Sequence, residues 1–386
     1  MMYKKVDELE PGDRIAQTLK HPRTQIVLIT PNYVLDLKTM PRVQKNLKSA
    51  GYSSVLIYNP ALAVLEQYYE AERQEARARL FQTLEQHCMT ADKAVVSRSS
   101  VMEFSRAIRS LCEAIRQSKL ATAFIELWAS GNDEMAIWRE KSAERSYLSL
   151  TLALDVRQKA LIEHNAAVKQ VGGTTVTDLG YEDLGIGSIF VDVFDIFGER
   201  ATAALLQELE QRPFARAVIR QRSQRFDGTG RPSNLPGHFA DTVLTGHEIH
   251  PYARIAQLAT AYAELHVGRP DPQRKGERIG QRIPARALWE MATAPEMAMG
   301  FDPEYLHSFL RMMQPYPLGH RVALNSGESG VVIGFDKEAP WCPAVRILQR
   351  DGKQVPEPYD VLLAQRPDLA VARFEDSTDD CLSFKL

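Results

Sequence analysis

The side chains best suited to chemistry in this 386-residue chain are arginines gathered between positions 212 and 231. Arg212, Arg216 and Arg220 are spaced four residues apart, which places them on one face of a helix. No aspartate or glutamate occurs from position 212 to position 226, so the local charge is strongly positive. Because the planar guanidinium fork matches the oxygens of a phosphate or a carboxylate, the pattern indicates anion binding. The competing interpretation is a basic face that is solvated or paired with acids such as Glu208 and Glu210.

A tight loop follows this helix, with the sequence Asp227-Gly228-Thr-Gly230-Arg231-Pro232. Glycine is needed where a chain turns this tightly, or where backbone or a ligand comes close, because it has no Cβ. Proline then fixes the exit from the loop. Arg225 and Asp227 suit a buried pair that shapes the loop as well as they suit a contact with a ligand.

The order of these parts resembles the signature of the HD-GYP family, His-His-Glu-Arg-x-Asp-Gly-x-Gly-Tyr-Pro-x-x-Leu-x-Gly, over residues 222–237. The resemblance implies an all-helical domain and a bacterial phosphodiesterase of cyclic di-GMP that uses two or three metal ions. Arg222 and Ser223 stand where the family has histidines, and Arg231 replaces the tyrosine. The frame of the motif is present, whereas its metal ligands are not.

Other motifs of the family are recognisable but altered. Residues 184–195 are similar to Leu-Gly-x-Ala-Leu-Leu-His-Asp-Ile-Gly-Lys; the aspartate is kept as Asp192, and Asp195 stands at the lysine. Residues 249–255 match Ile-x-x-x-Ala-Arg-Ile, with Arg254 as the arginine, and Arg269 belongs to a partial Asp-Arg-Pro-Tyr element. The resemblance places seven metal-ligand positions, of which Asp192 alone keeps a ligand: Thr151, Val191, Asp192, Arg212, Arg222, Ser223 and Thr260.

A site for two divalent ions needs converging imidazoles and carboxylates, and hydrolysis in this family needs a metal-bound hydroxide. We therefore expect a catalytically inactive, metal-free protein without a cofactor, in which Asp192 is a vestigial ligand and arginines stand in for the metals as fixed cations. The candidate ligand-binding residues are Arg212, Arg222, Arg225, Arg231, Arg254 and Arg269. The candidate interaction loop consists of Asp227, Gly228, Gly230, Arg231 and Pro232.

Two alternatives remain. One is a cyclic di-GMP phosphodiesterase with unorthodox ligands supplied by Asp192, Asp195, His247 or His250. His247 and His250 lack the i, i+4 spacing of the common zinc pair, so a loop of solvated histidines is the simpler interpretation. The other alternative is a dimerising structural adaptor that binds no nucleotide.

The resemblance also implies partners from cyclic di-GMP signalling. These are cyclic di-GMP itself and a GGDEF-type diguanylate cyclase, which family members contact through the glycine-motif loop; another acidic protein surface is the third candidate. Arg231 departs from the family at that contact loop. The hypothesis is a binding or scaffold component of this signalling system.

Composition excludes several other classes. With 47 basic and 49 acidic side chains and a net charge of −2, the chain does not resemble a nucleic-acid binder. Its 4 cysteines form no Cys-x-x-Cys pair, which argues against zinc fingers and a disulfide framework and fits a reduced cytoplasm. No apolar run reaches the roughly 18 residues of a membrane span. We expect a cytoplasmic protein.

The pattern of helices and strands expected along the chain predicts a mainly α fold. Residues 1–60 indicate a small α/β module, with strands at 25–30 and 54–58 around a helix. Residues 61–131 predict a helical linker or coiled-coil-like helices, and 132–318 the helical HD-GYP-like bundle. Period-two runs at 321–324, 330–335 and 344–348 indicate a small β-barrel over 319–370, with Asp351-Gly352 as a hairpin turn. Residues 371–386 look like a frayed acidic tail.

Two helices outside the bundle have patterns of their own. Residues 66–86 interleave acidic and basic side chains, which is typical of a solvated face. A heptad seam follows, which predicts either a helix packed on its own domain or a homodimer contact: Val101, Phe104, Ile108, Leu111 and Ile115.

Overall fold

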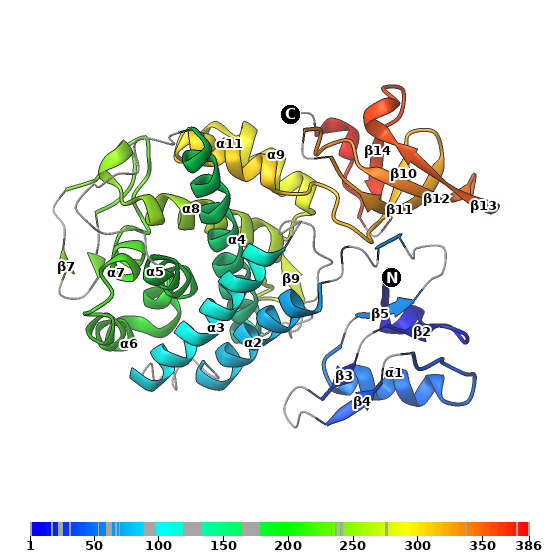
Figure 1. The fold of residues 1–386 in the computed structure, drawn as a ribbon, viewed down its shortest axis with the longest axis horizontal. Helices are drawn as coiled ribbons and strands as arrows, with labels where there is room; N and C mark the ends of the chain where they lie inside the picture. Colours follow the sequence, from blue (N-terminus) through cyan, green and yellow to red (C-terminus); the bar gives the residue numbers. More distant parts are fainter. Residues whose placement is uncertain are drawn as a thin grey trace.

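The structure is a computed structural model that describes residues 2–384, except 17, 22–25, 31, 53, 59–63, 66–67, 69, 89–97, 119–132, 164–177, 233, 236–237, 240–241, 275–276, 337 and 376. About half of the described residues are helical. The helices gather on one side of the molecule, and the N-terminal module and the C-terminal sheet lie on the other (Figure 1). No helix among the described residues is long and apolar enough to cross a membrane.

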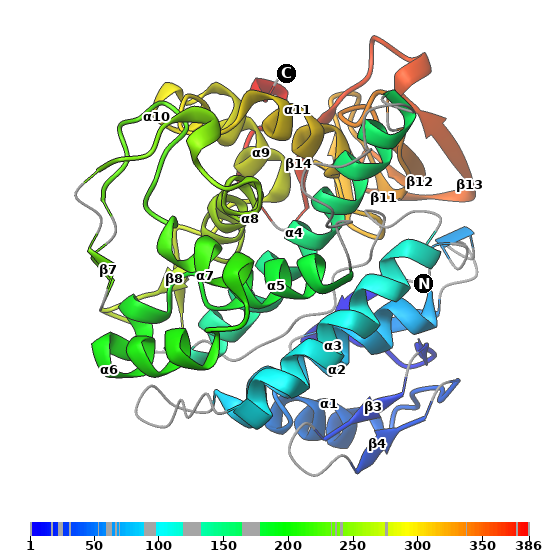
Figure 2. The same ribbon diagram turned by 60° about the vertical axis from the view of Figure 1, so that its left-hand side comes forward.

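The helical part is built around α4 (Glu134–Glu163), which packs against α5 (Asp178–Ile189) and α8 (Pro251–Val267). Around these lie α2 (Ala71–His87), α3 (Arg98–Gln117), α6 (Val193–Glu208), α7 (Pro213–Arg220), α9 (Pro284–Thr293), α10 (Pro295–Ala298) and α11 (Pro303–Met312). Figure 2 shows α4 and α8 at the centre of this group. The mainly α prediction agrees with this architecture.

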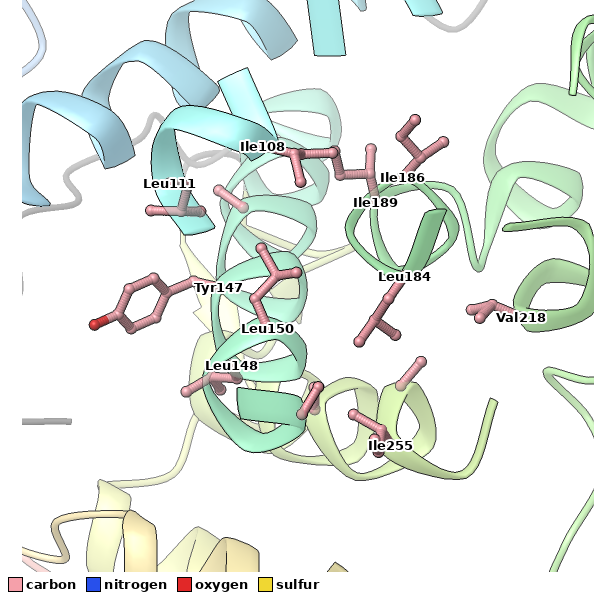
Figure 3. Packing of buried hydrophobic residues seen from close by; sticks show 14 of the residues in the cluster. Ile108, Leu111, Tyr147, Leu148, Leu150, Leu184, Ile186, Ile189, Val218 and Ile255 are labelled. Atoms are coloured by element: carbon pink, nitrogen blue, oxygen red, sulfur yellow. The ribbon is translucent and has the colours of Figure 1, made fainter. Parts of the chain in front are cut away.

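Glycines in α5 let its neighbours approach closely. A Cβ at Gly185 would lie 2.7 Å from the Ile108 side chain of α3, and one at Gly187 would lie 2.7 Å from Val218 of α7. The side chains of α3, α4, α5, α7 and α8 therefore meet in one apolar interior (Figure 3).

The heptad seam of α3 faces this interior. Phe104, Ile108 and Leu111 are 0% exposed and belong to the same buried cluster as α4 and α5. A dimer contact needs these side chains at the surface, so the seam packs on its own domain. Of the two alternatives that the sequence left open, packing on its own domain is the one that the burial of the seam supports.

The charged helix α2 has a solvated face only in part, because Glu72, Glu75 and Arg79 are exposed whereas two of its arginines are buried. Arg73 and Arg77 are only 1% and 3% exposed, and Arg77 Cζ lies 4.7 Å from the centre of the Tyr147 ring. Arg73 donates from Nη1 to Ser118 Oγ at 3.0 Å. The prediction was wrong for these two arginines, because their long stems cover the core while their heads find partners within it.

The buried side chains fall into two clusters. The first runs from Ala76 to Met313, so α2 and α3 share the core of the helical domain and the predicted boundary at 131 does not separate two cores. The second joins the N-terminal module to the C-terminal sheet, together with Ala285, Tyr316 and Leu318.

The N-terminal module contains β1 (Met2–Lys5), β5 (Ser54–Tyr58) and β2 (Arg14–Ile15) in one sheet, a β3 (Leu19–Lys20) and β4 (Val27–Ile29) hairpin, and α1 (Met40–Ser49). This confirms the predicted helix, the strand at 54–58 and part of the strand at 25–30, of which residue 25 lies outside the described residues. Strand β1, which pairs with β5, was not predicted.

The C-terminal sheet has the order β13-β12-β11-β10-β14. Its strands are β10 (Arg321–Leu324), β11 (Glu328–Gly334), β12 (Ala344–Arg350), β13 (Lys353–Leu362) and β14 (Val371–Phe374). Asp351 and Gly352 have φ values of 51° and 74°, which confirms the hairpin turn. A closed barrel stays a prediction. The prediction of a frayed tail over 371–386 is wrong. Strand β14 pairs with β10, Cys381 is buried, and Asp379 forms an ion pair with Arg286 at 2.7 Å.

Candidate functional site

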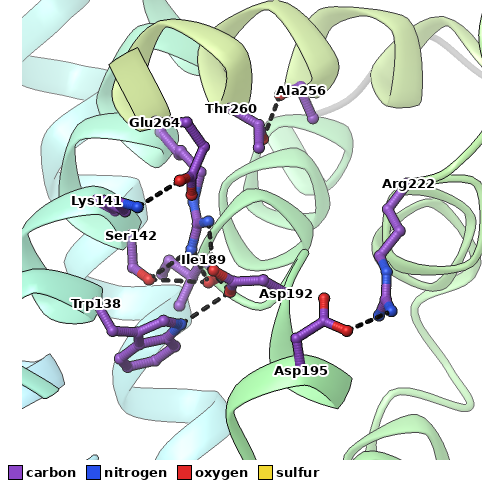
Figure 4. A network of polar contacts seen from close by, with 11 residues as sticks. Trp138, Lys141, Ser142, Ile189, Asp192, Asp195, Arg222, Ala256, Thr260 and Glu264 are labelled. Carbon is purple, nitrogen blue, oxygen red and sulfur yellow. Dashed lines mark hydrogen bonds and ion pairs between the residues drawn. The ribbon is translucent and has the colours of Figure 1, made fainter. Parts of the chain in front are cut away.

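A cavity of about 420 Å³ opens between α4, α6, α8 and the loop after α7. Figure 4 shows side chains of α4 and α8 turned toward Asp192, with Arg222 reaching Asp195 from the opposite side. Of the seven positions placed from the sequence, the cavity is lined by Val191, Asp192, Arg222, Ser223 and Thr260. The structure thus gathers residues that lie up to 69 positions apart in the chain (191 to 260).

Asp192 is held by two residues of α4. Its Oδ2 accepts from Arg145 Nη1 at 2.7 Å, and its Oδ1 accepts from Arg145 Nη2 at 2.9 Å and from Trp138 Nε1 at 2.8 Å. Asp192 is the N-cap residue of α6, yet its side chain makes no capping hydrogen bond. Both carboxylate oxygens are engaged, and a metal ion would have to displace a bidentate guanidinium.

Arg145 was missed by the sequence analysis. Its side chain is 0% exposed, and its Nη2 also donates to Ser142 Oγ at 2.8 Å and to the Ile189 carbonyl at 3.2 Å. The helix that carries it, α4, has no strong amphipathic pattern that would mark this turn as the one facing the centre.

The placement of a metal-ligand position at Thr151 is wrong. Thr151 is buried and donates through Oγ1 to the Tyr147 carbonyl at 2.8 Å, and it is not among the residues that line the cavity. It lies six residues further along α4 than Arg145, more than a turn and a half, so a different part of the helix faces Asp192.

Arg222 supplies a second cation to the cavity wall. Its Nη2 donates to Asp195 Oδ1 at 3.1 Å, and its Cζ lies 5.5 Å from the centre of the Phe194 ring. Arg222 Nη1 is buried and has no hydrogen-bond partner among the residues that the structure describes.

The donor set does not fit a divalent metal. The acidic residues of the wall each face a cation: Asp192 meets Arg145, Asp195 meets Arg222 and Glu264 meets Lys141. Within the described ranges, no group of three or more His, Cys, Asp or Glu side chains is placed to hold a metal ion. Guanidinium and ammonium groups repel a dication at these distances.

Arg212 lies outside the cavity. Its Nη1 donates to Asp183 Oδ1 at 2.9 Å and its Nη2 to Ser105 Oγ at 2.7 Å. Burial raises the pKa of Asp183, and the charge of Arg212 opposes that rise. The predicted ligand-binding role for Arg212 is therefore replaced by a structural role, which joins α7 to α5 and α3.

Arg254 is also engaged within the fold. It forms a buried ion pair with Asp302, and its Nε donates to the Ile249 carbonyl at 3.1 Å. Its Cζ lies 5.1 Å from the centre of the Tyr305 ring. Asp302 in turn caps α11 by accepting from the Glu304 amide at 3.0 Å. Arg254 thus fixes α11 against α8 and does not line the cavity.

The interaction loop is shaped by Arg225 and Asp227. Arg225 Nη2 donates to Asp227 Oδ2 at 2.9 Å, and the Thr229 amide donates to Asp227 Oδ1 at 2.9 Å. Arg225 and Thr229 hold the pKa of the Asp227 carboxyl well below its usual range. The Phe226 amide donates to the Gly300 carbonyl at 2.9 Å, which fastens the loop beside α10.

The glycines of the loop have the roles that the sequence predicts. Gly228 has a φ of 77°, and a Cβ at Gly230 would lie 2.6 Å from the Arg225 nitrogen and 2.7 Å from the Ser223 oxygen. Arg231 and Pro232 follow at the exposed end of the loop, and Arg269 is exposed on β8 (Arg269–Pro270). Of the six candidate arginines, only Arg222 and Arg225 line the cavity.

Gly230→Ala is expected to destabilise the protein by about 1–3 kcal/mol, because the new methyl group would press on backbone atoms that cannot rotate away. Gly334→Ala is the matched control, since its Cβ would meet only side-chain atoms at 3.4 Å. Urea unfolding of both variants measures the difference. Equal free energies of unfolding for the two variants would show that the backbone around Gly230 can move apart without a loss of stability.

His247 and His250 do not converge on one point. His250 caps α8, where its Nδ1 accepts from the Tyr252 amide at 3.2 Å, and burial with the nearby Arg254 charge lowers its pKa. His247 is exposed, and its Nδ1 lies 3.0 Å from Arg254 Nη1. The expected loop of solvated histidines is therefore correct for His247 and wrong for His250. Neither ring lines the cavity.

Residues 321–380 match the family model described as "KOW domain associated with HD domain". A Pseudomonas aeruginosa protein named a cyclic di-GMP phosphodiesterase is 27% identical over 139 residues, which are 36% of this chain and 29% of that protein. The match thus spans less than a third of that relative. No solved structure matches. The two similarities support an HD-domain family for this chain.

Proposed function

We propose that this chain carries a degenerate HD-GYP-like domain that hydrolyses no phosphodiester and serves as a binding or scaffold component in cyclic di-GMP signalling. The observation that carries the proposal is the engagement of both Asp192 oxygens by Arg145 and Trp138. The similarity to a protein named a cyclic di-GMP phosphodiesterase supplies the signalling context.

The physical basis is the chemistry of the cavity wall. Phosphodiester hydrolysis of this kind relies on a metal-bound hydroxide and on metal ions that stabilise charge on the phosphate oxygens. Here the retained carboxylate is held by the fully buried guanidinium of Arg145, and Arg222 occupies a second ligand position. These cations would hold an anion in the cavity without activating water to attack it.

A phosphodiesterase with unorthodox ligands is the competing proposal. It would draw on Asp192, Asp195, His247 or His250. Asp195 is 61% exposed and pairs with Arg222, while the two histidines contact Arg254 and the first turn of α8. Recruiting all four around an ion would require rebuilding the loop at 245–250.

The test is metal analysis and a hydrolysis assay on the same purified chain. We expect less than one equivalent of iron, manganese or zinc after growth with added metal, and no turnover of cyclic di-GMP. An active cyclic di-GMP phosphodiesterase, purified and assayed in parallel, is the positive control. Two bound metal ions per chain, or turnover abolished by metal removal, would reject the proposal.

Calorimetry addresses the ligand separately. If cyclic di-GMP is what the cavity binds, Arg222→Ala should weaken binding by about tenfold, since a charge-assisted hydrogen bond contributes about 1.5–3 kcal/mol. Arg269→Ala, an exposed arginine outside the cavity, is the matched control. No heat with intact protein would leave a protein partner, such as a GGDEF-type diguanylate cyclase or another acidic surface, as the binding target.

A further inference from the structure

Two arginines of α7, Arg216 and Arg220, have no counter-ion among the residues that the structure describes. Both are half-buried, and the Nε of each is buried without a hydrogen-bond partner. Neither makes an ion pair with any residue in the part of the chain that the structure describes. Glu208 and Glu210, the acids that the competing interpretation offered as partners, are exposed and make no such contact.

The two guanidinium groups also affect each other. Burial and the neighbouring charge of Arg216 both lower the pKa of Arg220. A purely solvated arginine would extend away from a like charge, since nothing would hold it there. The fold instead keeps two cations one helical turn apart and partly removed from water, and an anion beside them would offset that unbalanced charge.

The rest of α7 defines the face that these arginines border. Ala215, Val218 and Ile219 are buried and fix its inner side. On one flank, Arg212 bonds to Asp183 of α5. On the other flank, the Phe214 ring packs 5.2 Å from the His250 ring and remains 41% exposed. By helical spacing, Ala217 lies at the centre of the outer face. Arg216 and Arg220 lie on the same side of it as Arg212, and Phe214 lies on the other side.

We propose that this outer face of α7, defined by Phe214, Arg216, Ala217 and Arg220, is a docking surface for an acidic segment of a partner protein. The inference deepens the proposed binding role and rests on it. It adds a surface that is separate from the cavity, which neither arginine lines.

The spacing of Arg216 and Arg220 and the exposed Phe214 ring indicate what kind of partner fits this face. Side chains four residues apart on a helix lie about 5–6 Å apart, and alternate side chains of an extended strand lie about 6–7 Å apart. Two carboxylates at alternate positions of an extended segment can therefore each meet one guanidinium fork. The exposed Phe214 ring on the other flank of the helix adds an apolar contact of the kind that anchors protein interfaces, whereas a free phosphate would make no use of it.

The test uses a fluorescein-labelled peptide in which glutamate and serine alternate, with a glutamine-serine peptide as its uncharged control. Fluorescence anisotropy with the full chain should show binding of the acidic peptide that weakens as salt is added. Arg216→Gln/Arg220→Gln should reduce the affinity by about tenfold, as expected for two exposed ion pairs.

Arg42→Gln/Arg106→Gln is the matched control, because it removes two exposed helical arginines elsewhere and the same net charge. It should change the affinity less than twofold. Equal weakening by both double variants would overturn the proposal in favour of general electrostatic attraction. Displacement of the peptide by inorganic phosphate, at matched ionic strength, would assign the arginines to a phosphate ligand instead.

Arg216→Lys/Arg220→Lys keeps both charges and removes the planar forks. It should also weaken binding, and it replaces the glutamine variant if that variant does not fold. Wild-type affinity in the lysine variant would reject the guanidinium contact. Absent peptide binding in a preparation that is metal-free and does not hydrolyse cyclic di-GMP would reject the docking surface alone and leave the proposed function standing.

Discussion

Replacing Asp192 with alanine should lower the free energy of unfolding by about 3–5 kcal/mol, because it leaves the Arg145 guanidinium buried without its carboxylate. The affected guanidinium is 0% exposed in the intact fold. Chemical denaturation followed by circular dichroism, with Trp138 fluorescence as a local probe, measures the loss.

Two companion variants separate charge from shape. Asp192→Asn keeps an acceptor for Trp138 and should lose less stability than the alanine variant. Arg145→Met with Asp192→Asn removes both charges and should recover more than half of the loss, since a buried pair contributes little beyond its own desolvation. If Asp192→Ala were stable and lost a phosphodiesterase activity, Asp192 would be a working ligand and the pseudoenzyme proposal would fail.

Replacing Ile108 with aspartate should destabilise the helical domain by more than about 4 kcal/mol and yield little folded protein. Ile108 is 0% exposed, and its side chain packs where α5 has Gly185. A carboxylate there would have to be neutralised or would open the contact between α3 and α5. Solubility, circular dichroism and urea unfolding report the effect.

Met102→Asp is the matched control, because Met102 lies on the same helix and is 52% exposed. It should change stability by less than about 0.5 kcal/mol, as is usual for surface positions. Light scattering distinguishes the alternative: a dimer held by this seam would become a folded monomer on Ile108→Asp. That result would contradict the buried seam.

The sequence predicted those features of the site that depend on neighbouring residues. The loop from Asp227 to Pro232 is one, because its conformation follows from glycines and a proline at fixed spacing. The gathering of Asp192, Arg222 and Thr260 around one cavity is another, and it came from the order of family motifs rather than from periodicity.

Features that depend on distant partners were not predictable. Arg212 and Arg254 looked free because their acids, Asp183 and Asp302, lie 29 and 48 positions away in the chain. Arg145 was missed because a long helix without a strong amphipathic pattern does not reveal which turn faces the centre. Whether an arginine is held in a structural ion pair depends on which carboxylate the fold places beside it, and the local sequence does not show this.

The second buried cluster has a consequence for how the protein is made. Leu65 is 0% exposed and lies 4.0 Å from where a Cβ of Gly319 would be, and the Tyr68 hydroxyl similarly approaches Gly334 at 3.4 Å. Part of the apolar surface of the N-terminal module is therefore covered by strands that are translated more than 250 positions later. In a nascent chain halted after α11, that part of the N-terminal module would stay exposed and could bind chaperones. The C-terminal sheet therefore completes the core of the N-terminal module as well as its own.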